Sequence, residues 1–226
     1  MILVMIHLIL ALGMFLAAIT VFFKWQADQF DRQSPVKYFF WFFAFFAVAH
    51  FSLSLPFILT GDPTAMRWGY DLSIFFVFVM IAIFSRIWVY FSGFSMKKTM
   101  HAPFAIMAVG LVVLLIEARY SGLPSIDGNM VVWNAAPAAS LLIVSLAFLS
   151  SFALSYSLVR SLMKGIDPTS RLKLFLINLS VISIGISGLY FIASGWTAII
   201  TALAFNFLGA ISAASAFMMK EEKVKA

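Results

Sequence analysis

The chain has 226 residues and no cysteine, and 63% of its residues are hydrophobic whereas only 11% are charged. A soluble domain is about half apolar and a quarter charged, so one soluble core of this size would not bury this much apolar surface. The composition therefore argues against a disordered chain, a disulfide-stapled secreted domain and a nucleic-acid-binding domain, and it predicts a protein whose solvent is mostly lipid.

Seven apolar segments are long enough to be membrane-spanning helices, which need about 20 apolar residues each. In chain order, the predicted spans are residues 2–23, 38–60, 70–92, 102–118, 135–159, 172–194 and 197–219. They leave almost no chain for a soluble domain, so we predict an all-α, polytopic membrane protein with one seven-helix bundle over residues 1–226. The first segment has no basic residues before it, and we expect a retained helix rather than a cleaved signal peptide.

The basic residues indicate how this bundle is oriented. Twelve Lys and Arg residues fall in the first, third and fifth loops and the C-terminal tail, whereas only Arg67 and Arg119 fall in the loops on the other side. Cytoplasmic loops carry the excess of Lys and Arg, so we predict an outer N-terminus and a cytoplasmic C-terminus in a prokaryotic inner membrane. This bias accounts for the net charge of +6 without a nucleic-acid partner.

Few strongly polar side chains lie within the predicted spans, and each is a functional hypothesis because lipid disfavours it. His50 lies near the middle of the second span, with Ser52 two residues further along. Pro56 cannot donate to the carbonyl of Ser52, so we expect a kink and a free acceptor there. This stretch is the best candidate for a buried polar pocket; the alternative is a neutral histidine bonded to a neighbouring helix.

Three other polar side chains lie in the third, sixth and seventh spans. Arg86 either extends to the cytoplasmic headgroups or pairs with a polar group of the bundle, and Asn178 is a partner at a suitable depth. Asn206 lies among small residues that allow close helix packing. We expect the fifth to seventh helices to be the packed side and the Phe-rich first three to face lipid. The ligand-binding candidates are His50, Ser52, Arg86, Asn178 and Asn206.

Two carboxylates and a histidine pair complete the set of candidates. Asp71 and Glu117 fall at the outer ends of the third and fourth spans, where we expect solvated side chains or an outer vestibule that receives a cation or a proton. A haem b would use His7 and His50, but counting residues from the outer surface predicts depths that differ by roughly 7–8 Å at 1.5 Å per residue. The three histidines of the chain lack a carboxylate or thiol cluster, so no metal site is predicted.

The topology narrows the possible relatives. A microbial rhodopsin needs a lysine in its seventh helix for retinal, and residues 197–219 contain none. In its size, its loop lengths and its loop at residues 61–70, the whole chain resembles the seven-helix sensor region at the front of bacterial histidine kinases. The resemblance is one of architecture and implies signal transduction. The tail ends six residues after Lys220, so we expect no kinase domain.

The sequence contains no nucleophile–base pair, no paired carboxylates and no phosphate-binding loop. We therefore predict a non-enzymatic membrane protein without a cofactor that binds or senses a small apolar ligand, or that is a membrane subunit of a larger complex. A protein partner would bind the basic loops and tail or the Phe-rich helices. Two alternatives stay open: a small-solute transporter or channel built from two three-helix repeats, and a haem-bearing redox subunit that uses His7 and His50.

Overall fold

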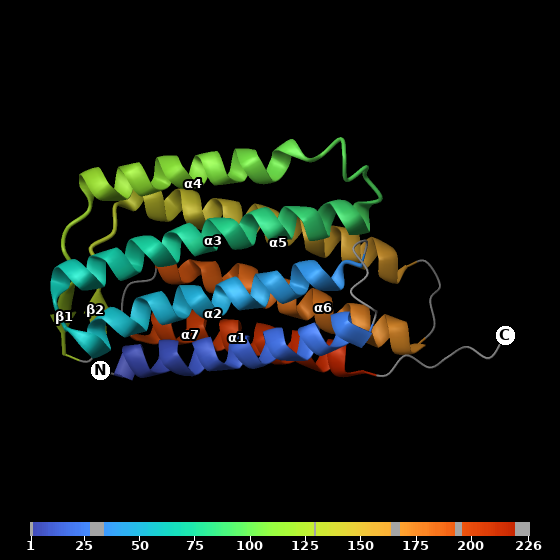
Figure 1. Ribbon diagram of the computed structural model, residues 1–226, viewed down its shortest axis with the longest axis horizontal. Coiled ribbons are helices and arrows are strands. Elements are labelled where there is room, and N and C mark those ends of the chain that lie inside the picture. The colour runs from blue at the N-terminus through green and yellow to red at the C-terminus, as the bar shows by residue number, and fades with distance from the viewer. Residues whose placement is uncertain (1, 28–33, 129, 164–167, 193–195, 220–226) are drawn as a thin grey trace.

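The computed structural model describes residues 2–27, 34–128, 130–163, 168–192 and 196–219. Within these ranges, seven long helices lie alongside one another in an elongated bundle (Figure 1). They are α1 (Ile2–Ala27), α2 (Val36–Leu59), α3 (Pro63–Ser92), α4 (His101–Tyr120), α5 (Pro137–Leu162), α6 (Pro168–Ser187) and α7 (Trp196–Met218). All seven are long and apolar enough to cross a membrane, so the chain has the architecture of an integral membrane protein.

The helix ends differ from the predicted spans where polar residues cap or extend a helix. The helix α3 begins seven residues before the predicted span, because Asp62 is its N-cap and Pro63 occupies its first position. The Asp62 carboxylate accepts a hydrogen bond from the Ala65 backbone N–H at 2.8 Å. At the other extreme, α6 ends at Ser187 and continues as a 3₁₀ turn, η1 (Gly188–Phe191). Hydropathy identifies the apolar part of a helix, whereas capping decides where it begins.

A short β-hairpin marks one end of the bundle. Strands β1 (Ser125–Asp127) and β2 (Met130–Val132) pair antiparallel in the connection between α4 and α5. Val131 of β2 is buried and packs in one apolar cluster with Leu3 and Val4 at the start of α1. The helix α1 begins at this end, which we call the hairpin end, and α7 ends at the opposite end (Figure 1).

The Phe-rich helix α2 lies inside the bundle, which corrects the expectation that the first three helices face lipid. Phe39, Phe42, Phe43 and Phe46 are buried, and Phe42 stacks on Phe84 of α3 with ring centroids 4.4 Å apart. In the most apolar 18-residue stretch of each helix, 50% of the residues of α2 and α3 are buried, against only 17% of those of α4. Phenylalanine is equally suited to lipid and to a protein interior, so only packing decides between them.

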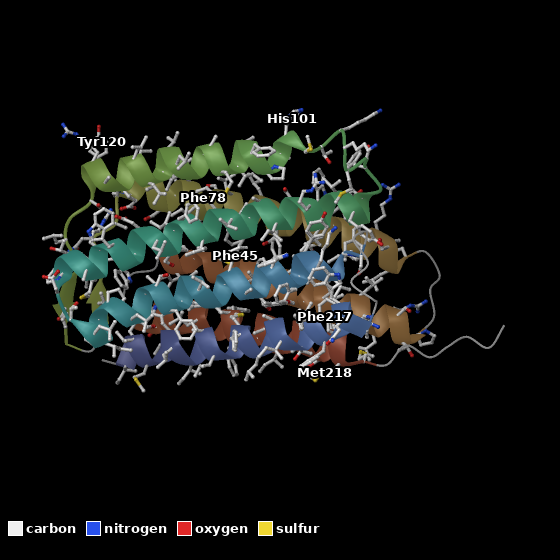
Figure 2. The ribbon with its side chains drawn as sticks, viewed as in Figure 1. Phe45, Phe78, His101, Tyr120, Phe217 and Met218 are labelled. Atoms are coloured by element: carbon white, nitrogen blue, oxygen red, sulfur yellow. The ribbon has the colours of Figure 1, made fainter. Side chains whose placement is uncertain are left out.

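Glycines set two close helix contacts. A Cβ atom on Gly69 of α3 would lie 2.2 Å from the carbonyl oxygen of Ser52, so α2 and α3 cross at this point without room for a side chain. On the outside of the bundle, a Cβ atom on Gly110 of α4 would lie 2.6 Å from the ring of the buried Phe78. Figure 2 shows Phe78 within the bundle and His101 and Tyr120 at the two ends of α4.

Candidate functional site

An apolar cavity lies between α2, α3, α5, α7 and the junction of α6 with η1. The cavity has a volume of about 70 Å³, which is roughly the share of two water molecules at about 30 Å³ each in the liquid. Most of its wall consists of Phe, Ile, Val, Ala and Met side chains. The polar side chains of its wall are His50, Ser73, Ser151, Ser187, Tyr190 and Asn206. Small-molecule sites typically have such a largely apolar wall with a few polar groups.

Four side chains from four parts of the sequence form a hydrogen-bonded series that ends at this cavity, and we call it the histidine chain (Trp133, Tyr190, His7, His50). The indole N–H of Trp133, just after β2, donates to the hydroxyl of Tyr190 in η1 at 2.8 Å. That hydroxyl is 3.0 Å from Nε2 of His7 in α1. Nδ1 of His7 is in turn 2.9 Å from Nδ1 of His50 in α2. Phe46 stacks on the His50 ring with centroids 5.0 Å apart.

The histidine chain ends at His50, which lines the cavity. His50 Nε2 is buried and has no hydrogen-bond partner among the described residues, and the same holds for Oδ1 of Asn206 across the bundle on α7. Both residues are at most 4% exposed and line the cavity. Leaving a buried polar atom unpaired costs about 1–3 kcal/mol, so proteins normally satisfy such atoms with a ligand or ordered water. The cavity wall is therefore suited to hold a polar atom of a bound molecule.

The contact between His7 and His50 corrects the expected difference in their depths. The counting placed the outer ends of both helices in one plane, but α2 extends past the start of α1. The Ser54 hydroxyl lies 3.4 Å from the Val4 carbonyl, five residues before α2 ends at Leu59 and only two residues after α1 begins. The two rings consequently meet. Nitrogens in direct hydrogen-bond contact leave no space for an iron atom between them, so this arrangement does not fit a haem b shared by His7 and His50.

Three of the sequence-predicted ligand candidates do not line the cavity. The Ser52 hydroxyl donates to the Val48 carbonyl of its own helix at 2.8 Å. The Arg86 guanidinium donates to the carbonyls of Met96 and Thr99 in the α3–α4 connection, at the end opposite the hairpin. Asn178 is buried on α6, and its Oδ1 lacks a partner among the described residues. Of the five candidates, the structure brings only His50 and Asn206 together.

A second polar cluster lies at the hairpin end, and we call it the ion-pair cluster (Arg67, Asp71, Glu117). Nη2 of Arg67 is 3.0 Å from Asp71 Oδ1 and 3.1 Å from Glu117 Oε2. The other oxygen of Glu117 accepts from the backbone N–H of Ala136, just before α5, at 3.1 Å. Nη1 of Arg67 donates to the Gly122 carbonyl at 3.4 Å. One carboxylate thus joins α3, α4 and the start of α5.

The expected solvation of Asp71 and Glu117 is wrong for Glu117 and only partly right for Asp71. Glu117 is 0% exposed, and the Asp71 side chain is 22% exposed. Neither carboxylate is among the described residues that line the wide pocket at this end. We expected solvated carboxylates because both residues lie near helix ends. Arg67, four residues before Asp71 on α3, is instead the charged partner that allows Glu117 to be buried.

A wide pocket at the hairpin end lies next to the cavity. Its volume is about 690 Å³, compared with about 70 Å³ for the cavity, and it is lined by β2, the start of α5, η1 and part of α7. Tyr190 and Phe191 of η1 line both spaces. On this side, Trp133 stacks on Tyr70 with ring centroids 5.1 Å apart. Tyr190 and Phe191, which line both spaces, therefore lie between the open pocket and the cavity.

Sequence reasoning missed Tyr190 and Trp133 as parts of the site. Both read as ordinary interfacial aromatics, because Trp and Tyr are common near helix ends. The useful signal was the buried polar side chain itself: a histidine in lipid needs a partner, and the partner is more often found on another helix. His7 was noted only as a haem ligand, although it is the residue that joins His50 to Tyr190.

Comparison with known proteins adds no further assignment. No protein-family model matches this chain, and no curated protein matches its sequence significantly.

Proposed function

We propose that this chain is a non-enzymatic membrane protein that binds a small, mostly apolar ligand in the cavity between α2, α3, α5, η1 and α7, as a sensor or binding module. One observation carries the proposal: His50 and Asn206, which line the same largely apolar cavity, each hold a buried polar atom without a hydrogen-bond partner among the described residues. A purely structural interior would place apolar atoms there or pair the polar ones.

The orientation supports an external origin for the ligand. In the sequence, twelve Lys and Arg residues fall in the first, third and fifth loops and the C-terminal tail, and this excess favours a cytoplasmic location, in a prokaryotic inner membrane, for the end of the bundle opposite the hairpin. The hairpin end, with its wide pocket beside Tyr190 and Phe191, would then face outward. A protein partner would receive the signal at the end of the bundle opposite the hairpin. Residues 220–226 of the tail lie outside the described residues.

The test is the small-molecule content of the purified protein. We expect extracts of the wild type, isolated in native lipid discs, to contain a low-mass apolar compound that is depleted in Ala49→Leu, which fills part of the cavity. The matched control is Ala108→Leu on the exposed surface of α4. Mass spectrometry should give the same extract for the control and the wild type. Identical extracts from all three proteins would contradict the proposal.

A second candidate function, transport of a small solute, is favoured by a different observation. Tyr190 and Phe191 lie between the cavity and the open pocket, in a segment where α6 changes from an α-helix to a 3₁₀ turn. Transporters place interrupted helices at their binding sites. Uptake of the co-purified compound into proteoliposomes would favour transport, whereas binding without flux would favour the sensor.

A further inference from the structure

The direction of the hydrogen bonds in the histidine chain follows from counting protons. Trp133 carries a donor only, so it donates to Tyr190, whose oxygen still has a proton to give. If the Tyr190 hydroxyl donates to His7 Nε2, neutral His7 carries its proton on Nδ1 and donates it to His50 Nδ1. His50 then carries its own proton on Nε2.

The reverse direction leaves more groups unpaired. If His50 Nδ1 donates to His7, neutral His7 must carry its proton on Nε2 and donate it to the Tyr190 oxygen. The Tyr190 hydroxyl proton then has no acceptor among the described residues, and His50 Nε2 is an unpaired acceptor. The forward direction leaves only the His50 Nε2–H unpaired. Since each buried unpaired group is costly, the forward direction is favoured.

We infer that the cavity selects a compact, mostly apolar ligand that carries a carbonyl-type oxygen, and that the Nε2–H of His50 donates to this oxygen. The inference rests on the proposed binding function and adds the chemical class of the ligand to it. A cavity of about 70 Å³ is about half the volume of roughly 150 Å³ that holds benzene, so it admits a body of about three or four non-hydrogen atoms. Phe46, stacked on the His50 ring, holds the plane in which the N–H points.

The Tyr190 hydroxyl is the positioning group in this arrangement, because its proton sets the direction of the whole chain. It does not have to touch the ligand oxygen. Removing the hydroxyl while keeping the ring should let both neutral forms of His7 and His50 exist together. The site would then lose its preference for an acceptor oxygen while keeping its shape.

The binding test uses two molecules of the same shape, acetone and 2-methylpropene, which differ only in C=O against C=CH₂. Affinities are measured by saturation-transfer NMR with the protein in lipid discs, as the ratio of wild type to variant for each probe, which cancels partitioning into lipid. We expect Tyr190→Phe to weaken acetone binding by about tenfold, the cost expected for an unpaired or misdirected buried donor. 2-Methylpropene should bind both proteins equally. The control Tyr156→Phe changes an exposed tyrosine of α5 and should alter neither ratio.

The outcomes separate this inference from the proposed function. If both probes bind, Ala49→Leu excludes both, and Tyr190→Phe changes neither ratio, the cavity binds ligands but the inferred oxygen selectivity is wrong. If neither probe binds in the cavity of the wild type, both proposals fail. If the Tyr190→Phe protein does not fold, the histidine protonation of the wild type, measured by NMR, decides the question.

The proton positions can be read directly in the wild type. The chain has three histidines, and the third, His101, is exposed at the start of α4, so ¹⁵N-labelled histidine gives three separable rings. We expect His50 to carry its proton on Nε2 and His7 on Nδ1. A His50 ring protonated on Nδ1 with Nε2 bare would overturn the inference.

Discussion

The ion-pair cluster and the histidine chain are both buried polar groups near the hairpin end, but they differ in whether they are complete. In the ion-pair cluster each oxygen of Glu117 has a hydrogen-bond partner. Asp71 Oδ1 accepts no hydrogen bond from the described residues, but it is ion-paired with Arg67 at 3.0 Å, so every charged group of the cluster has a partner. In the histidine chain, every link is made except the last, at His50 Nε2. A complete cluster holds helices together, whereas a chain that stops at a cavity has capacity left for another molecule.

The largest expected effect comes from breaking the complete cluster. Glu117→Leu should lower the free energy of unfolding by about 3–5 kcal/mol, because it leaves the Arg67 guanidinium and the Ala136 N–H short of partners in a buried place. The change is measured by unfolding the protein in mixed micelles that contain an increasing fraction of a denaturing detergent. Asp127→Asn, on the exposed hairpin, is the control and should stay within about 0.5 kcal/mol of the wild type. An equally small effect of Glu117→Leu would remove the distinction between the two clusters.

A smaller loss of stability is expected when the histidine chain is broken at one residue, and most of this loss should be regained when both histidines are replaced. His50→Leu should cost about 1–3 kcal/mol, because it leaves His7 Nδ1 buried without a partner. His7→Leu/His50→Leu replaces both partners by apolar groups, so it should regain most of that loss while the cavity loses its polar donor. The same unfolding assay checks the stability. If the double variant loses more unfolding free energy than His7→Leu and His50→Leu lose together, the histidines stabilise the fold.

The smallest effect is expected at Ser52, which the sequence placed beside His50 as a ligand candidate. Its hydroxyl bonds to the Val48 carbonyl of the same helix and does not line the cavity. Ser52→Ala should therefore change the free energy of unfolding by less than about 0.5 kcal/mol and leave acetone binding unaltered. Loss of binding in this variant would extend the site beyond the described cavity.

The sequence predicted part of this contrast. Burial of a histidine in lipid is costly, so His50 stood out from its position alone, and Asn206 did so for the same reason. Sequence spacing could not show that Arg86 reaches the α3–α4 connection, because a long side chain has several carbonyls and amides within its reach. Nor could it show that Glu117 is buried, since its cation comes from α3, fifty residues earlier in the chain.

The amino-acid sequence was enough to predict seven apolar helices, because each segment has the length of a membrane span and unpaired backbone groups are costly in lipid. Which helix faces pack together could be seen only in the folded chain. Side chains such as Phe and Leu are as stable against lipid as against protein, so hydropathy carries no information about neighbours. The offset of α1 against α2 brought His7 to His50, and the close approach of Gly69 to Ser52 fixed where α2 and α3 cross.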